Sequence, residues 1–205
     1  SYAMSVDTKT RGIGAMISDE KRIVSAEGTK NEAADYIPVR YHSAPQKKAE
    51  GDIVTLTYDA KGDIAKRERK DPDDPSWRPL PSNEEINTAR DPITAAFILR
   101  QKLYSQRDTA DTNVVTRSYD GLRLAEMRFI RTLNAKVEVM GHYVDTVRVA
   151  VKRAPINGYT AKELKKYKKG DPEIHVYFSN DADFLPVRAT ARAGIGELSM
   201  TLIEK

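Results

Sequence analysis

Apolar and polar residues alternate along most of this chain, which is the pattern of half-buried β-strands. The stretch IVTLTYDAKGDIAKRER predicts a strand at 53–58, a turn at 59–62 and a second strand from Asp63. The stretch TNVVTRSYDGLRLAEMRFIRT predicts strands at 114–119 and 122–131. Asp120-Gly121 suits a tight hairpin turn between them, because both central positions of that turn need a positive φ.

Similar alternation elsewhere extends the β-rich plan to the whole chain. It predicts strands at 2–9, 14–26 and 36–42, two more on either side of Gly141, and three between Glu173 and Glu204. The last three are separated by 179–183 and by Gly194-Ile195-Gly196. We therefore expect a mainly β protein of about eleven strands, arranged as a curved antiparallel sheet or half-open β-barrel with one or two short helices.

Two segments have helical signals. In DPITAAFILR, Asp91 can cap the helix amides, Pro92 suits the first helical position, and good helix formers continue to Leu103. In TAKELKKYK, Thr160 and Glu163 form a capping box. The proline-rich segment 70–90 is expected to be an irregular loop.

The apolar run after Pro92 is too short to be a membrane anchor, because about 20 apolar residues are needed to span a bilayer. With 205 residues, the chain has the length of one substantial domain. We expect a single domain over 1–205, with a helical plug at about 91–104 and a lysine-rich insertion at about 158–171.

Composition excludes several chemistries. The chain has no cysteine, so it has no disulfide, thiol nucleophile or thiolate metal site. His42, His142 and His175 are far apart and lack ligand spacing, and the Asp-Pro segment 71–75 lacks the glycine and distal glutamate of a calcium loop. We expect no catalytic residue, no cofactor, no metal and no nucleic acid partner.

The net charge of +4 is concentrated in one segment. Between Lys152 and Lys169 there are seven basic residues and one acidic residue, Glu163. This segment has two interpretations: a solvated surface, or a patch that binds phosphate, lipid headgroups or cell-wall polymers. The basic patch consists of Lys162, Lys165, Lys166, Lys168 and Lys169.

Four motifs, in this order, resemble a known family. They are YAMS followed by GIGAM, VTLTYDAKGDI, RDPITAAFILR, and the closing IHVYFSNDADFLPVRATARAGIGELSMTLIE. This order is similar to the proteobacterial envelope family named domain of unknown function 3108. The resemblance extends from about Tyr2 to Glu204, and its sharpest motifs are Asp91-Pro92 and Leu185-Pro186-Val187-Arg188. The lysine-rich segment departs from the usual pattern.

The resemblance implies an exported protein, periplasmic or outer-membrane-associated, without known enzyme activity, and it favours a periplasmic chain whose leader has been removed. It also implies a fold similar to the lipoprotein carriers, in which a curved antiparallel sheet wraps around helical or loop plugs. We expect the chain not to span a membrane, and its possible partners are a lipid or other hydrophobic ligand, or a cell-wall or envelope protein.

We therefore expect a non-enzymatic cell-envelope protein that binds an apolar or amphipathic ligand, or an envelope partner, in its concave sheet. The side chains expected to line that site are Phe97, Ile98, Leu99, Leu103, Val114, Leu124, Met127 and Phe129. The same residues would equally fill a closed core. The alternative is an interaction module that binds peptidoglycan, anionic lipid or protein through the basic segment 160–169.

Overall fold

The computed structural model describes residues 1–8, 22–31, 35–45, 52–70, 79–87, 89–106, 112–170, 173–193 and 196–201. Four features named in the sequence lie outside these residues. They are the Asp-Pro segment 71–75, the GIGAM motif at 12–16, most of the predicted strand at 14–26, and the first two residues of the predicted bend at 194–196.

Eleven strands in the described part form two antiparallel sheets, which confirms the mainly β class and the approximate strand count. The first sheet has the order β1(Tyr2–Thr8), β2(Arg22–Lys30), β3(Tyr36–Pro45), β4(Ile53–Tyr58) and β5(Ile64–Lys70). The second has the order β11(Gly196–Thr201), β10(Pro186–Ala193), β9(Glu173–Ser179), β8(His142–Asn157), β7(Leu124–Val139) and β6(Asn113–Tyr119). Strand neighbours in each sheet are also neighbours in sequence, and the sheets do not close into a barrel.

Three helices are described: α2(Asn83–Asn87), α3(Pro92–Ser105) and α4(Ala161–Lys168). The expectation of one or two helices was wrong, because α2 lies where an irregular loop was predicted. A capping box explains it: the Ser82 amide donates to Glu85 Oε2 at 2.7 Å, and the Glu85 amide donates to Ser82 Oγ at 3.2 Å.

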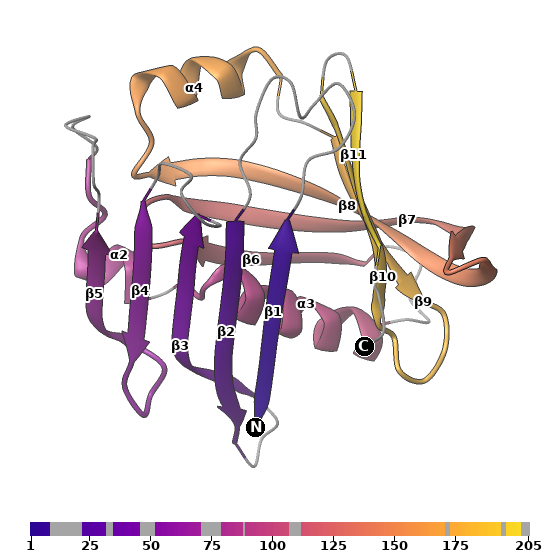
Figure 1. Ribbon diagram of the computed structural model, residues 1–205, viewed down its shortest axis with the longest axis horizontal. Helices are drawn as coiled ribbons and strands as arrows, with labels where there is room; N and C mark the ends of the chain where they lie inside the picture. Colours follow the sequence, from indigo (N-terminus) through magenta and orange to yellow (C-terminus); the bar gives the residue numbers. More distant parts are fainter. Residues whose placement is uncertain are drawn as a thin grey trace.

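The two sheets cross, and α3 lies between them (Figure 1). In Figure 1, α3 passes behind the middle of β1–β3, β6 and β7 pass behind the part above it, and β8 runs higher, above the ends of these strands. Helix α4 lies at the upper end of the molecule, above β8. This arrangement gives each sheet an inner face toward the other sheet and an outer face toward solvent.

Two hairpins differ from the sequence prediction. The connection between β6 and β7 has four residues: the Asp120 carboxylate accepts the amides of Leu122 and Arg123, at 2.9 and 2.6 Å, and Tyr119 pairs with Leu124. The turn with two positive φ angles is instead Met140-Gly141, at 52° and 80°. The predicted strands at 122–131 and before Gly141 form one 16-residue strand, β7.

The interior consists of two apolar clusters. Cluster A joins the inner face of the first sheet to the start of β7 and to Ile86, Ala89 and Ile93 near the two helices α2 and α3. Cluster B joins Leu99 and Leu103 of α3 to the inner face of the second sheet, including Val149 and Phe178. Helix α3 therefore contributes side chains to both clusters.

Two glycines share a positive φ but differ in how closely other atoms surround them. Gly141 and Gly158 have nearly equal φ angles of 80° and 82°. A Cβ at Gly141 meets nothing within 4 Å, whereas a Cβ at Gly158 lies 1.9 Å from the Leu122 carbonyl oxygen. Gly158 is thus required by close packing of the chain leaving β8 against the connection before β7.

We expect Gly141→Ala to lower the free energy of unfolding by about 1 kcal/mol, because only the positive φ is penalised. Gly158→Ala should cost about 1–3 kcal/mol more, since the methyl group displaces backbone. Urea unfolding of both variants measures the difference. Equal losses would contradict the close approach at Gly158.

Candidate functional site

The start of α3 is fixed by a buried carboxylate. The Asp91 side chain is fully buried, and its Oδ1 accepts the amides of Ile93 at 3.0 Å and Thr94 at 2.9 Å. The Tyr58 hydroxyl of β4 lies 3.5 Å from Asp91 Oδ2, at the limit of a hydrogen bond. The predicted cap at Asp91 is confirmed, and it also faces the first sheet.

The same segment joins the second sheet. The Arg90 amide donates to the Arg117 carbonyl at 3.1 Å, and the Tyr119 amide donates to the Arg90 carbonyl at 2.9 Å. One residue before the cap, the chain is therefore paired with β6. Adjacent residues thus connect α3 to both sheets.

Aromatic side chains hold α3 against the first sheet. The Phe97 ring is 4.9 Å from that of Tyr2 and 5.3 Å from that of Tyr36, measured between centroids. The Tyr2 hydroxyl and Thr94 Oγ1 are 2.7 Å apart. Burial raises the pKa of Tyr2 to about 12, so its hydroxyl stays protonated at neutral pH.

The last turns of α3 contact the second sheet. The Arg100 guanidinium donates to the carbonyls of Asp183 and Phe184, the latter at 2.9 Å. The Phe184 ring stacks on Phe178, with centroids 5.0 Å apart, and Tyr104 lies 5.9 Å from Phe184. The helix is thus attached at one end through Asp91 and at the other through Arg100.

The eight residues predicted to line a ligand site are distributed between the two clusters. Leu124 and Phe97 belong to cluster A, and Leu99, Leu103, Val114, Met127 and Phe129 belong to cluster B. Ile98 is half-buried on α3. None of the eight lines the two hollows found on the first sheet, which are described below.

Half-buried apolar side chains continue both inner faces beyond the clusters. Met4 and Val24 are half-buried on β1 and β2, packed against cluster A. Met127, Ile174 and Val176 are half-buried on β7 and β9, packed against cluster B. Sequence alternation identified Met127, but the other four were missed because their strands carry shorter alternating patterns.

The predicted basic patch lies on α4. Its five lysines are all exposed, and α4 has no buried residue. The predicted capping box is confirmed: the Thr160 amide donates to Glu163 Oε2 at 2.8 Å, and the Glu163 amide donates to Thr160 Oγ1 at 3.3 Å. Glu163 also binds Arg123 at 2.6 Å, and the Tyr167 hydroxyl donates to the Arg153 carbonyl at 2.7 Å.

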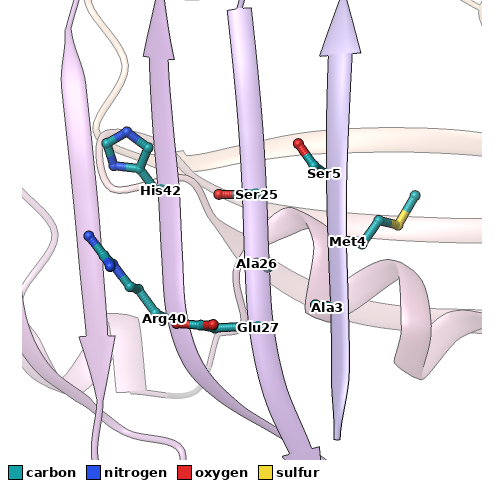
Figure 2. A pocket seen from close by; sticks show the side chains of 8 residues that line it. All are labelled: Ala3, Met4, Ser5, Ser25, Ala26, Glu27, Arg40 and His42. Carbon is teal, nitrogen blue, oxygen red and sulfur yellow. The ribbon is translucent and has the colours of Figure 1, made fainter.

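A hollow of about 440 Å³ lies on the outer face of β1–β3 (Figure 2). It is lined by Ala3, Met4, Ser5, Ser25, Ala26, Glu27, Arg40 and His42. A second hollow of about 340 Å³ shares Ala3 and Glu27 with it and extends to Gly28 and Val39. Sequence analysis did not identify this site, because small and polar residues on one strand face carry no motif.

His42 is a polar group of the outer hollow that lies within hydrogen-bonding distance of a neighbouring side chain. His42 Nδ1 is 3.1 Å from Thr55 Oγ1, and partial burial followed by the charge of Arg40 lowers the pKa of His42. His42 is therefore neutral at pH 7. Across the described residues, no group of three or more potential metal ligands is present.

The model of a family described as "Protein of unknown function (DUF3108)" matches residues 1–203. The chain belongs to this family. Searches of curated proteins and of solved structures found no match. Membership in DUF3108 confirms the resemblance seen in the sequence. Within its described part, this DUF3108 protein has no helix of the length and hydropathy needed to cross a bilayer.

The pH dependence of stability tests the buried cap. Burial raises the pKa of Asp91 above its ordinary 3.8, against the hydrogen bonds from Thr94 and Ile93, which lower it. A carboxyl whose pKa is higher in the folded chain stabilises the fold most when protonated. That contribution is fully present below the unfolded pKa of about 3.9 and is lost as the pH rises through the folded pKa.

Asp91→Asn keeps an oxygen acceptor but has no titrating carboxyl. The free energy of unfolding of the wild type, relative to Asp91→Asn, should therefore increase as the pH falls from 7 to below about 3.9. Denaturant unfolding of both proteins at several pH values measures this difference. A difference that is constant, or that decreases on acidification, would refute it. Relative to Asp91→Asn, Asp91→Ala should be less stable by about 1–2 kcal/mol at every pH, since two amides lose their acceptor and neither variant titrates at this position.

Proposed function

We propose that this protein is a non-enzymatic binding protein of the cell envelope that holds an apolar or amphipathic ligand between its two sheets, next to α3. The periplasmic address and the exported form belong to this proposal, and the family resemblance supports them. The observation that carries it is the pair of inner faces, both of which continue past the clusters as half-buried apolar side chains.

The chemistry of these faces favours an apolar ligand. Half-buried methionine, valine and isoleucine side chains gain about 25 cal/mol per Å² when further apolar surface covers them. The described strands of one sheet do not pair with those of the other, so a ligand can enter without breaking a strand pair among them. Methionine is also the side chain that adapts best to ligands of different shape.

Helix α3 sets the size of the binding space. It is attached by polar contacts at its two ends, by the Phe97 ring, and by its buried side chains in the two clusters. A small displacement of the helix enlarges the space between the clusters, and contacts with an apolar ligand replace the contacts that Leu99 and Leu103 lose. On this proposal, α3 is a movable plug, and the eight predicted residues line the enlarged site.

Charged substitutions on the two inner faces test this proposal. We expect Met4→Glu and Ile174→Glu each to weaken binding of a fluorescent fatty acid analogue by at least about tenfold, because the ligand would bury an unpaired carboxylate. The matched control is Val115→Glu, since Val115 is 42% exposed and lies on the outer face of β6. Thermal unfolding of all three variants verifies that they fold.

The proposal requires weaker binding in both Met4→Glu and Ile174→Glu. Binding that is equal in all variants, or absent from the wild type, would rule out a ligand between the sheets. Native mass spectrometry of protein purified from its own host would in addition identify the ligand.

A second candidate function rests on α4, which presents its lysines on a fixed support. The only acid of the helix, Glu163, is engaged by the cap and by Arg123. Among the described residues, no ion pair reaches the five lysines of the patch. We propose that this patch binds anionic lipid at a membrane surface, with peptidoglycan as the alternative polymer to be compared.

A charge-matched comparison tests this patch. Replacing Lys165, Lys166, Lys168 and Lys169 by glutamine should weaken binding to phosphatidylglycerol vesicles by at least about tenfold. The control replaces four exposed lysines elsewhere, Lys61, Lys66, Lys70 and Lys136, so that both variants lose the same charge. Cosedimentation at low and high salt measures binding. Equal loss in both variants would mean that only net charge matters.

A further inference from the structure

The outer face of the first sheet carries a site that is separate from the inner faces. Strand alternation and register bring its side chains together in two cross-strand rows. One row places Ser5, Ser25 and His42 side by side on β1, β2 and β3, and the other places Ala3, Glu27 and Arg40 in the same order. On β1 and β2 the side chains of these rows are small except for Glu27, and on β3 they are the longer His42 and Arg40.

Glu27 and Arg40 are direct register partners of opposite charge, and both are exposed. Cross-strand partners of this kind commonly form an ion pair. Here no ion pair joins either side chain to another residue of the described part. In Figure 2 the Arg40 guanidinium is directed away from the Glu27 carboxylate, toward the side of His42. The hollow therefore presents a separated positive and negative group.

A β-bulge opens the site at its other end. The register between β2 and β3 shifts after the Glu27–Arg40 pair, because Gly28 pairs with Pro38 and leaves Val39 without a partner in β2. Val39 is 43% exposed and lines the second hollow, which is continuous with the first through Ala3 and Glu27. An apolar contact is thus available beside the carboxylate. Bulges commonly redirect side chains in this way at binding sites.

These groups match one class of small molecule. A guanidinium binds a carboxylate through two parallel hydrogen bonds, and a carboxylate binds an ammonium group. The serine hydroxyls and neutral His42 supply donors and acceptors between the two charges. The volume of about 440 Å³ is within the range of small-ligand sites.

We propose that the outer hollow binds a zwitterionic ligand of amino acid or dipeptide size. Arg40 takes the ligand carboxylate, Glu27 takes its ammonium group, and a side chain next to the ammonium group rests on Val39. This site is independent of the ligand proposed between the sheets, since it lies on the opposite face of β1–β3.

Three related probes test the two charged contacts: dialanine, N-acetyl-dialanine and dialanine amide. Titration of the full chain, followed by NMR shifts of the amides of Ser5, Ser25 and Arg40, gives the affinities. The wild type should bind dialanine about threefold to tenfold more tightly than either blocked probe, which is the range expected for exposed ion pairs. The advantage should decrease as salt is added.

The variants assign each charge to its partner. Arg40→Gln should weaken dialanine and N-acetyl-dialanine but leave dialanine amide unchanged, because that probe has no carboxylate. Glu27→Gln should weaken dialanine and dialanine amide but leave N-acetyl-dialanine unchanged. Lys66→Gln and Glu68→Gln are the controls, since this exposed pair, joined at 2.8 Å, belongs to β5 of the same sheet.

The proposal requires both selective losses and unaffected controls. Absence of shifts with dialanine at millimolar concentration, equal affinity of the wild type for all three probes, or equal effects of the control variants would each overturn it. Retention of the dialanine shifts in Ile174→Glu is expected, because Ile174 lies on β9 and does not line the outer hollow. This result separates the site from the one between the sheets.

Discussion

The structure depends on the buried carboxylate of Asp91. It satisfies two amides at the start of α3, faces the Tyr58 hydroxyl of the first sheet, and follows a residue that is paired with β6 of the second. Burial of a carboxylate without such partners is costly, so the cap fixes where the helix begins and which way it runs. Because the two sheets share no strand pair, this short segment sets how they are placed around α3.

On the proposed function, separation of the two sheets leaves room for a ligand. In a small closed barrel whose interior is filled by side chains, each inward side chain has neighbours on all sides. In this protein, side chains of α3 fill part of the space between the two sheets and contact the inner faces of both. The inner faces beyond the helix therefore keep apolar side chains that are only half-buried, such as Met4 and Ile174. The same alternation that makes these faces apolar places Glu27, Arg40 and the two serines outside.

Sequence alternation and capping signals were sufficient for the class, most strands and two of the helices. These signals did not predict features that depend on contacts between residues far apart in the sequence. Asp120-Gly121 suggested a tight turn, but burial of Leu122 extends the connection by two residues, and Met140-Gly141 forms the tight turn instead. The capping box of α2 was present at Ser82 and Glu85 but was hidden among prolines. The outer hollow could not be predicted, because it requires the register that makes Glu27 and Arg40 neighbours.

Helix α4, unlike α3, does not contribute to the core. None of its side chains is buried, and it is held by the Arg123–Glu163 pair and by the hydrogen bond of the Tyr167 hydroxyl. Because no side chain of α4 is buried in the core, packing does not explain why the helix is so rich in lysine. Repulsion among the lysines lowers the stability of an isolated helix, and the capping box and the Arg123 pair offset that cost. On the proposed lipid-binding role, a helix that is held in place presents these exposed lysines in a fixed arrangement.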